Sequence, residues 1–167
     1  MDRVHNSSFA VRLKEYGYTV GLFGKYLNAI PGTNITKPGA YVPQGFDAWF
    51  ANGGGDYISP EFATSGLEES SGYANGAVHF NSSVYSTSII GNKSIAWLHR
   101  VYNSEKPFML TVSPKAPHVP SAPAPWYEQE FNNLTAPRDD DAYNASRQAL
   151  SNHHELISSQ APISTEQ

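Results

Sequence analysis

The chain has 167 residues, which is long enough for one domain with a sizeable core, and its formal net charge is -4 at pH 7. Its 11 Lys and Arg residues are scattered and do not form the clustered cationic face that binding to a phosphate backbone needs, so nucleic acid is excluded as a partner. The absence of cysteine excludes disulfides and thiolate metal sites. Because no apolar run approaches the ~18 residues of a membrane span, we also expect no transmembrane helix.

The amino-terminal part of the chain predicts a helix followed by a strand. A helix over residues 7–16, capped by a serine, precedes Gly17, which suits the left-handed exit of a helix. The apolar face expected of this helix consists of Phe9, Leu13 and Tyr16. The β-rich run 18–24 ends at a glycine, so Lys25 lies directly beyond the predicted carboxyl end of a strand. A helix and a strand joined by one residue are typical of an α/β fold.

Residues 28–83 have a different composition, rich in Gly, Pro, Asn and Ser, and show no helical period. Short strands are expected at residues 46–50 and 56–62, and the NGGG sequence at 52–55 predicts a turn or loop. The aromatic side chains of this segment are expected to pack against a sheet. We interpret the segment as an elaborated crossover inside one domain, to which all of residues 1–167 belong.

Regular structure returns with a helix over residues 86–102, for which Ser86 or Thr87 is the expected N-cap. One face of this helix is apolar and expected to be buried, and it consists of Ile90, Trp97 and Val101. Another face is polar and expected to be exposed, and it consists of Asn92, His99 and Asn103. The run Phe108–Val112 that follows is apolar and uncharged, which is typical of a strand buried on both faces.

A proline-framed loop at residues 114–120 follows this strand and carries Lys115 and His118. In a parallel sheet the carboxyl ends of the strands meet at one edge, where α/β proteins bind their ligands. We therefore expect Lys25 and His118 to converge there and to hold an anion. A lysine suits a tetrahedral oxyanion, and a histidine can bind an anion or give a proton to a leaving alkoxide. From the residues alone, a solvated lysine and a loop-capping histidine remain the alternatives.

Beyond the proline loop we expect a short helix over residues 124–131 and a loop-like stretch over 132–151. The chain also contains six N-x-S/T sequons, which favour the secretory pathway as its compartment, although Asn- and Ser-rich sequences also generate such triplets by chance. The expected glycosylation sites are Asn34, Asn81, Asn92, Asn133 and Asn144, and the remaining sequon is at Asn6.

Several segments together resemble the sulfatase family, in particular its N-acetylglucosamine-6-sulfatase and arylsulfatase branch. The resemblance covers nearly the whole chain, and its most specific part is the combination of GKYLN with PFMLTVSPKAPH. It implies an alkaline-phosphatase-like α/β fold, a mostly parallel sheet with helices on both faces, of which this chain would be the central part. The matching motifs are LKEYGYTVGLFGKYLN at 13–28, VPQGFDAWFA at 42–51, YST from residue 85, KPFMLTVSPKAPHVP at 106–120, APWYEQEF at 124–131 and HHELI at 153–157.

The resemblance also implies a chemistry, the hydrolysis of sulfate esters of carbohydrates or aryl alcohols. In such enzymes a formylglycine hydrate attacks sulfur and a Ca²⁺ ion polarises the sulfate. By resemblance, Lys25 contacts the sulfate and His118 binds it and assists the leaving group, so both are candidate catalytic residues. The candidate substrate contacts are Asn28, Lys115 and His154. The resemblance further implies a secreted or lysosomal protein.

The sequence departs from the family pattern in two respects. It contains no C/S-x-P-x-R motif, the precursor of formylglycine, and it lacks the metal-binding aspartates of the family. We therefore assign no metal ligand in this chain, and we expect the missing parts of the domain on segments before Met1 and after Gln167. The chain alone is expected to be inactive. Two alternatives stay open: a non-catalytic sulfatase-like module that binds sulfated glycans, and a phosphatase or phosphodiesterase of the same superfamily.

Overall fold

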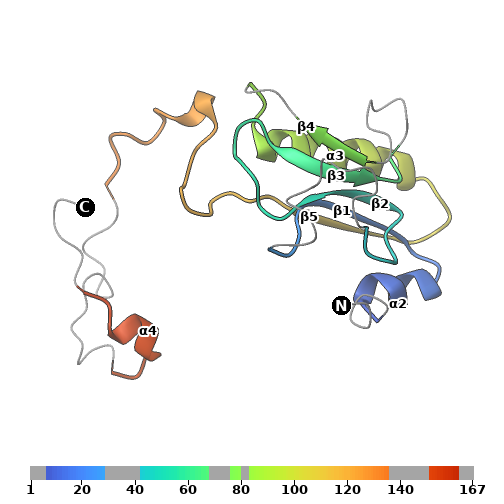
Figure 1. The fold of residues 1–167 in the computed structure, drawn as a ribbon, viewed down its shortest axis with the longest axis horizontal. Helices are drawn as coiled ribbons and strands as arrows, with labels where there is room; N and C mark the ends of the chain where they lie inside the picture. Colours follow the sequence, from blue (N-terminus) through green and yellow to red (C-terminus); the bar gives the residue numbers. More distant parts are fainter. Residues whose placement is uncertain (1–6, 29–41, 68–75, 80–82, 136–150, 162–167) are drawn as a thin grey trace. The chain divides into compact units, whose positions relative to one another are not determined.

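The computed structural model describes residues 7–28, 42–67, 76–79, 83–135 and 151–161. The chain divides into two compact units, Met1–Pro125 and Trp126–Gln167, which are described separately. Within the described residues the first unit contains a five-stranded sheet in the order β4-β3-β2-β1-β5 (Figure 1). Its elements are α2 (Phe9–Glu15), β1 (Thr19–Lys25), β2 (Ala48–Asn52), β3 (Glu61–Ser65), β4 (Gly76–His79), α3 (Ser86–Val101) and β5 (Phe108–Ser113).

The sheet is mixed, and its parallel part contains the strands that carry the predicted site. β1 pairs in parallel with β2 on one side and with β5 on the other, with Phe23 opposite both Phe50 and Val112. The strands β3 and β4 then extend the sheet in antiparallel fashion beyond β2. The segment predicted to be an elaborated crossover thus adds three strands to the same sheet. An α/β fold with helix-to-strand units is confirmed.

Both faces of β1 are packed, since alternate residues of a strand face opposite sides of the sheet. On one face, Phe23 packs against Phe50 and against Trp97 of α3, with ring centroids 6.3 and 5.9 Å apart. A Cβ placed on Gly21 would lie 3.1 Å from the Trp97 indole, so the indole occupies the space where a side chain would stand. The other face is covered by a second apolar cluster of Leu22, Trp49, Ala51 and Ala63, against which Tyr26, Val42 and Phe46 pack.

α2 begins where predicted but buries a different residue. Ser8 is the N-cap and accepts a hydrogen bond from Val11 N at 3.5 Å. The predicted apolar face is wrong, because Phe9 is 52% and Tyr16 80% exposed while Ala10 is buried. The Phe9 ring meets the Phe46 ring in an edge-to-face arrangement, with centroids 6.2 Å apart.

The face that α3 buries is as predicted, since Ile90, Trp97 and Val101 are buried. The predicted polar face is exposed as well, and His99 lies on the surface. The predicted N-cap is wrong, because Tyr85 holds that position and offers no side-chain hydrogen bond. Instead, the first amide of the helix, Ser86 N, donates to Tyr57 O at 2.7 Å. A backbone carbonyl from the loop between β2 and β3 therefore accepts from one of the amides that have no partner within the helix.

The prediction that β5 is buried on both faces is wrong. Among the described strands β5 forms the edge of the sheet and pairs only with β1. Met109 and Val112 are 40% and 46% exposed, although Leu110 packs against the α3 cluster. An apolar composition therefore did not indicate how many neighbours this strand has. β3 also begins later than predicted, at Glu61, and Ile58 forms an isolated bridge with Tyr85.

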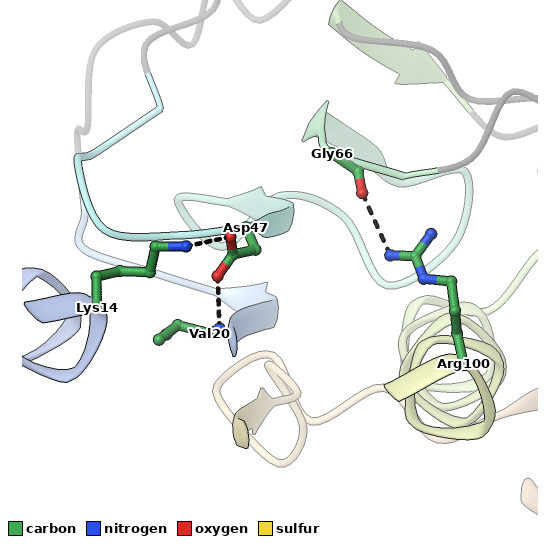
Figure 2. A network of polar contacts seen from close by, with 5 residues as sticks. All are labelled: Lys14, Val20, Asp47, Gly66 and Arg100. Atoms are coloured by element: carbon green, nitrogen blue, oxygen red, sulfur yellow. Dashed lines mark hydrogen bonds and ion pairs between the residues drawn. The ribbon is translucent and has the colours of Figure 1, made fainter. Parts of the chain in front are cut away.

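A polar network holds the start of the parallel strands (Figure 2). The Asp47 carboxylate is bonded to the Lys14 ammonium through one oxygen and accepts Val20 N at 2.8 Å through the other. The Asp47 amide in turn donates to Val20 O at 2.7 Å. At the far end of β3, Arg100 of α3 donates to Gly66 O at 3.3 Å. The contacts of Asp47 therefore join the last turn of α2 to the beginnings of β1 and β2, and Arg100 joins α3 to the end of β3.

The described part of the second unit contains little regular structure. A single 3-10 turn, η2 (Pro125–Tyr127), stands at its beginning, so the helix predicted over residues 124–131 is wrong in length and type. A short helix, α4 (Glu155–Ser158), follows at residues that the sequence left without an element. Most of the stretch predicted to be loop-like, at 136–150, lies outside the described residues. None of the helices in the described ranges is both long and apolar enough to span a bilayer.

Candidate anion-binding site

Three parallel strands end at one edge of the sheet and bring the predicted site residues to it. β1 ends at Lys25, β2 ends at Asn52 directly opposite it, and β5 ends at Ser113 one register position earlier. The proline loop with His118 leaves from the end of β5. Lys25 and the start of the loop that carries His118 therefore lie at the same edge of the sheet.

The ends of β1 and β5 approach each other unusually closely. Gly24 has φ +115°, and a Cβ at this position would lie 2.1 Å from Ser113 O. Only glycine satisfies both requirements, since an L side chain rarely adopts this conformation and has no room here. The Ser113 hydroxyl then donates to Lys25 O at 2.7 Å. The backbone of Lys25 is therefore held by both neighbouring strands.

The NGGG loop after β2 lies beside the Lys25 side chain. The side chain of Asn52 shapes the loop. Its Oδ1 accepts a hydrogen bond from Gly54 N at 3.1 Å, and its Nδ2 donates to Glu61 O at 3.0 Å. A Cβ placed on Gly54 would stand 3.8 Å from Lys25 Cε, so the half-buried lysine stem runs along this glycine. The loop therefore lies against the aliphatic stem of this lysine.

Lys115 contacts the same loop from the other side. Its ammonium donates to Gly55 O at 2.6 Å and lies 4.6 Å from the centroid of the Tyr57 ring. A lysine over an aromatic face gains a cation–π attraction in addition to the hydrogen bond. In this arrangement Lys115 ties the proline loop to the NGGG loop. Lys25 and Lys115 therefore flank one short glycine-rich segment.

His118 is exposed, and its neighbours account for most of its polar groups. Its amide donates to Lys115 O at 3.0 Å, and its carbonyl accepts the Tyr57 hydroxyl. The ring Nδ1 lies 2.6 Å from Val119 O. Because a carbonyl can only accept, Nδ1 must carry the proton in the neutral ring, which leaves Nε2 as the nitrogen available to a ligand.

The remaining predicted substrate contacts are Asn28 and His154. Asn28 is exposed three residues after Lys25, and His154 belongs to the second unit, where its Nδ1 caps α4 by accepting Leu156 N at 3.1 Å. Of the glycosylation sites, Asn92 and Asn133 are exposed. The hydroxyl of Ser94, in the Asn92 sequon, is buried and donates to Ile90 O at 2.7 Å. The other predicted sites lie outside the described residues: Asn34, Asn81 and Asn144.

The described residues do not fit a calcium site. Nowhere in these ranges do three His, Asp or Glu side chains gather as metal ligands. Calcium takes six to eight oxygen ligands, and the ammonium of Lys25, which ends β1, repels a cation. The arrangement at this edge is suited instead to an anion, and no step through a metal or through formylglycine is assigned to it.

Comparison with known proteins identifies the family of this chain. A sequence model of the sulfatase family matches residues 2–159. The chain belongs to the sulfatase family. Two relatives are the extracellular sulfatase SULF-1 homolog of Drosophila melanogaster, 33% identical over 156 residues, and the N-acetylglucosamine-6-sulfatase of Capra hircus, 32% identical over 133 residues. These matches cover 84% and 74% of this sulfatase-family chain.

A solved structure shows the same fold. It is described as a complex with its substrate D-glucosamine-2-N,6-O-disulfate, is 24% identical to this chain and superimposes with a TM-score of 0.56 over 95% of it. The sulfatase-family chain spans only part of all three proteins, 12% of the Drosophila relative, 21% of the goat relative and 34% of the solved structure. The alkaline-phosphatase-like α/β fold expected from the resemblance is thus confirmed for a partial domain.

Two residues at this edge were missed by the sequence reasoning, Tyr57 and Tyr85. Both are buried, and both donate hydrogen bonds to backbone carbonyls, Tyr57 to His118 O in the proline loop and Tyr85 to Ala122 O two residues beyond it. Neither lies in a periodic pattern, since Tyr57 is in an irregular loop and Tyr85 precedes a helix. The available signal is weak: a buried tyrosine needs a partner for its hydroxyl, whereas the aromatic residues near the NGGG loop were expected mainly to pack against a sheet.

Proposed function

We propose that this chain forms the sulfate-holding edge of a sulfatase that hydrolyses sulfate esters of carbohydrates, with Lys25 and His118 as its contribution. The observation that supports the proposal is that Lys25 ends β1 while the loop with His118 leaves the end of the neighbouring parallel strand β5. Membership of the sulfatase family supports sulfate as the anion. The names of the relatives support an amino sugar as the alcohol part of the ester.

Each residue has a role that follows from its chemistry. The ammonium of Lys25 is a compact charge that neutralises an oxygen of the sulfate. His118, protonated at Nε2, donates its proton to the sugar oxygen as the bond between sulfur and that oxygen breaks. Lys115 holds the two loops together and adds positive potential. The sequence contains no C/S-x-P-x-R motif from which the formylglycine nucleophile is made, so the chain is assigned binding and proton transfer only.

A second candidate, a binding module without catalysis, is favoured by one observation. The sequence has no cysteine and no S-x-P-x-R motif from which formylglycine could be made. In that case Lys25 and His118 hold a sulfated glycan that is not hydrolysed. A longer reading frame that carries a C/S-x-P-x-R motif upstream supports the enzyme, and a longer frame without one supports the binding module.

The test is a calorimetric titration of the 167-residue chain with glucosamine 6-sulfate. We expect saturable binding that weakens at least about tenfold in Lys25→Ala, because a charged hydrogen bond contributes roughly 1.5–3 kcal/mol. The matched control is Lys106→Ala, an exposed lysine that precedes β5 at the opposite end of the strand, which leaves the affinity unchanged. Equal affinities of Lys25→Ala and the unchanged chain would contradict the proposal.

The proposed compartment is the secretory pathway, as the sequons and the name of the extracellular relative suggest. Asn92 and Asn133 are the exposed acceptors within the described residues. Material for the titration is best expressed in a secreting eukaryotic host. A lower apparent mass after N-glycosidase treatment supports the compartment, and an unchanged mass contradicts it.

A further inference from the structure

Two buried tyrosines from separate elements lie beneath the proline loop. Tyr57 comes from the loop between β2 and β3, and Tyr85 is the N-cap of α3. Their rings stack, with centroids 6.0 Å apart and planes 17° from parallel. Ala124 completes this cluster, against which Ala116 and Ala122 also pack. The loop that carries His118 is therefore attached to the body of the unit by an aromatic pair.

The two hydroxyls donate to different backbone carbonyls, one in the proline loop and one just beyond it. Tyr57 donates to the carbonyl of His118 itself, and Tyr85 donates to Ala122 O at 2.9 Å, four residues further on. Three prolines in this stretch lack an amide hydrogen, so the loop can form few backbone hydrogen bonds of its own. The hydroxyls supply donors that the loop cannot supply itself.

The environment keeps the Tyr57 hydroxyl protonated and therefore a donor. Burial raises the pKa of Tyr57 above its ordinary value of 10, and the neighbouring Tyr85 adds to this effect. The Lys115 ammonium lies over the face of the Tyr57 ring and donates to Gly55 O, so the ring also has a cation–π contact. The neutral, packed Tyr57 side chain can therefore keep its hydroxyl bonded to the carbonyl of His118.

We propose that Tyr57 is a positioning residue for His118. By holding the His118 carbonyl it fixes the backbone from which the ring extends, so that Nδ1 meets Val119 O and Nε2 faces the ligand. This inference rests on the proposed function, in which His118 contacts the sulfate. It goes further because it assigns the orientation and tautomer of the histidine to a hydroxyl from a different part of the chain.

The hydroxyl, rather than the ring, is what the proposal requires, and a Tyr57→Phe variant separates the two. Phenylalanine keeps the stack with Tyr85 and the cation–π contact with Lys115 while it removes the bond to His118. A residue that only fills the core would tolerate this change at the site. A positioning residue would not, because the loop would lose the bond at the histidine.

The experiment measures the ring nitrogens of His118 by NMR in the 167-residue chain labelled with ¹⁵N-histidine. The signals are assigned by their loss in His118→Gln. In the unchanged chain, with the ring neutral, we expect Nδ1 protonated and Nε2 unprotonated. In Tyr57→Phe we expect both tautomers, together with an affinity for inorganic sulfate that is several-fold, up to about tenfold, weaker. In Tyr85→Phe the changes at His118 are expected to be smaller, because its bond goes to Ala122.

The control is Tyr16→Phe, because Tyr16 lies exposed just after α2, and it leaves both measurements unchanged. A folded Tyr57→Phe protein with the tautomer and the sulfate affinity of the unchanged chain would overturn the proposal. If Tyr57→Phe does not melt cooperatively, NMR of the unchanged chain measures how fast the Tyr57 hydroxyl proton exchanges with water. A slowly exchanging proton supports the bond to His118 O, and the lack of such a signal at low temperature overturns the proposal. If the unchanged chain binds no sulfate while Tyr57→Phe still shifts the tautomer, the proposed function fails and the positioning role stands.

Discussion

β1 and β5 are neighbouring parallel strands that each lead to a residue of the proposed site, yet they are held in different ways. β1 has a strand on both sides and an apolar cluster on both faces, and Phe23 is fully buried. β5 has one neighbour among the described strands, and Met109 is 40% exposed. The sheet itself thus fixes Lys25, whereas His118 depends on hydrogen bonds from outside its own strand.

The largest expected effect separates the two strands by stability. Phe23→Ala should lower the free energy of unfolding by about 3–5 kcal/mol, because it leaves a cavity between Phe50 and Trp97. Met109→Ala should cost less than about 1 kcal/mol, because much of this side chain already contacts water. Urea denaturation followed by circular dichroism measures both. Equal losses would mean that β5 is packed as tightly as β1.

An intermediate effect is expected where the two strands meet. Gly24→Ala should cost about 2–5 kcal/mol, because an alanine at φ +115° is strained and its Cβ would collide with Ser113 O. Gly17→Ala is the control, since Gly17 also has a positive φ, +82°, but nothing lies within 4 Å of the added Cβ. It should cost about 1–2 kcal/mol from strain alone. A Gly24→Ala loss no larger than the control would show that the strands can separate at this point.

The smallest effect concerns the beginning of β1. Asp47→Asn removes the ion pair with Lys14 but keeps an oxygen for Val20 N, so a loss of about 1 kcal/mol is expected. Glu15→Gln, which breaks the exposed pair with Arg12, should change the stability by less than about 0.5 kcal/mol. Thermal denaturation in low and in high salt measures both variants. A larger loss for Glu15→Gln than for Asp47→Asn would contradict the view that Asp47 anchors the strand.

The sequence predicted the elements whose signals are local. The burial of Ile90, Trp97 and Val101 follows from helical periodicity, and β1 follows from an apolar run between glycines. The meeting of Lys25 and the His118 loop at one edge follows from a general property of parallel sheets. These features need no knowledge of which distant segments come together.

The features that were missed or wrong depend on distant partners. The exposure of β5 reflects its place at the edge of the described sheet, which composition does not encode. The first amide of α3 bonds to the carbonyl of Tyr57 in place of a side-chain cap. The hydroxyl of the same tyrosine bonds to the carbonyl of His118. Nothing in the sequence around Tyr57 indicates either contact, because both partners lie far along the chain.

The indole of Trp97 stands where a side chain at position 21 would be. A bulkier residue at 21 has room only if position 97 becomes smaller, and a smaller residue at 97 leaves a void unless position 21 grows. These two sites share one fixed volume across the boundary between a strand and a helix. Among descendants of a common ancestor they should therefore change in concert, so that the size gained at one is lost at the other.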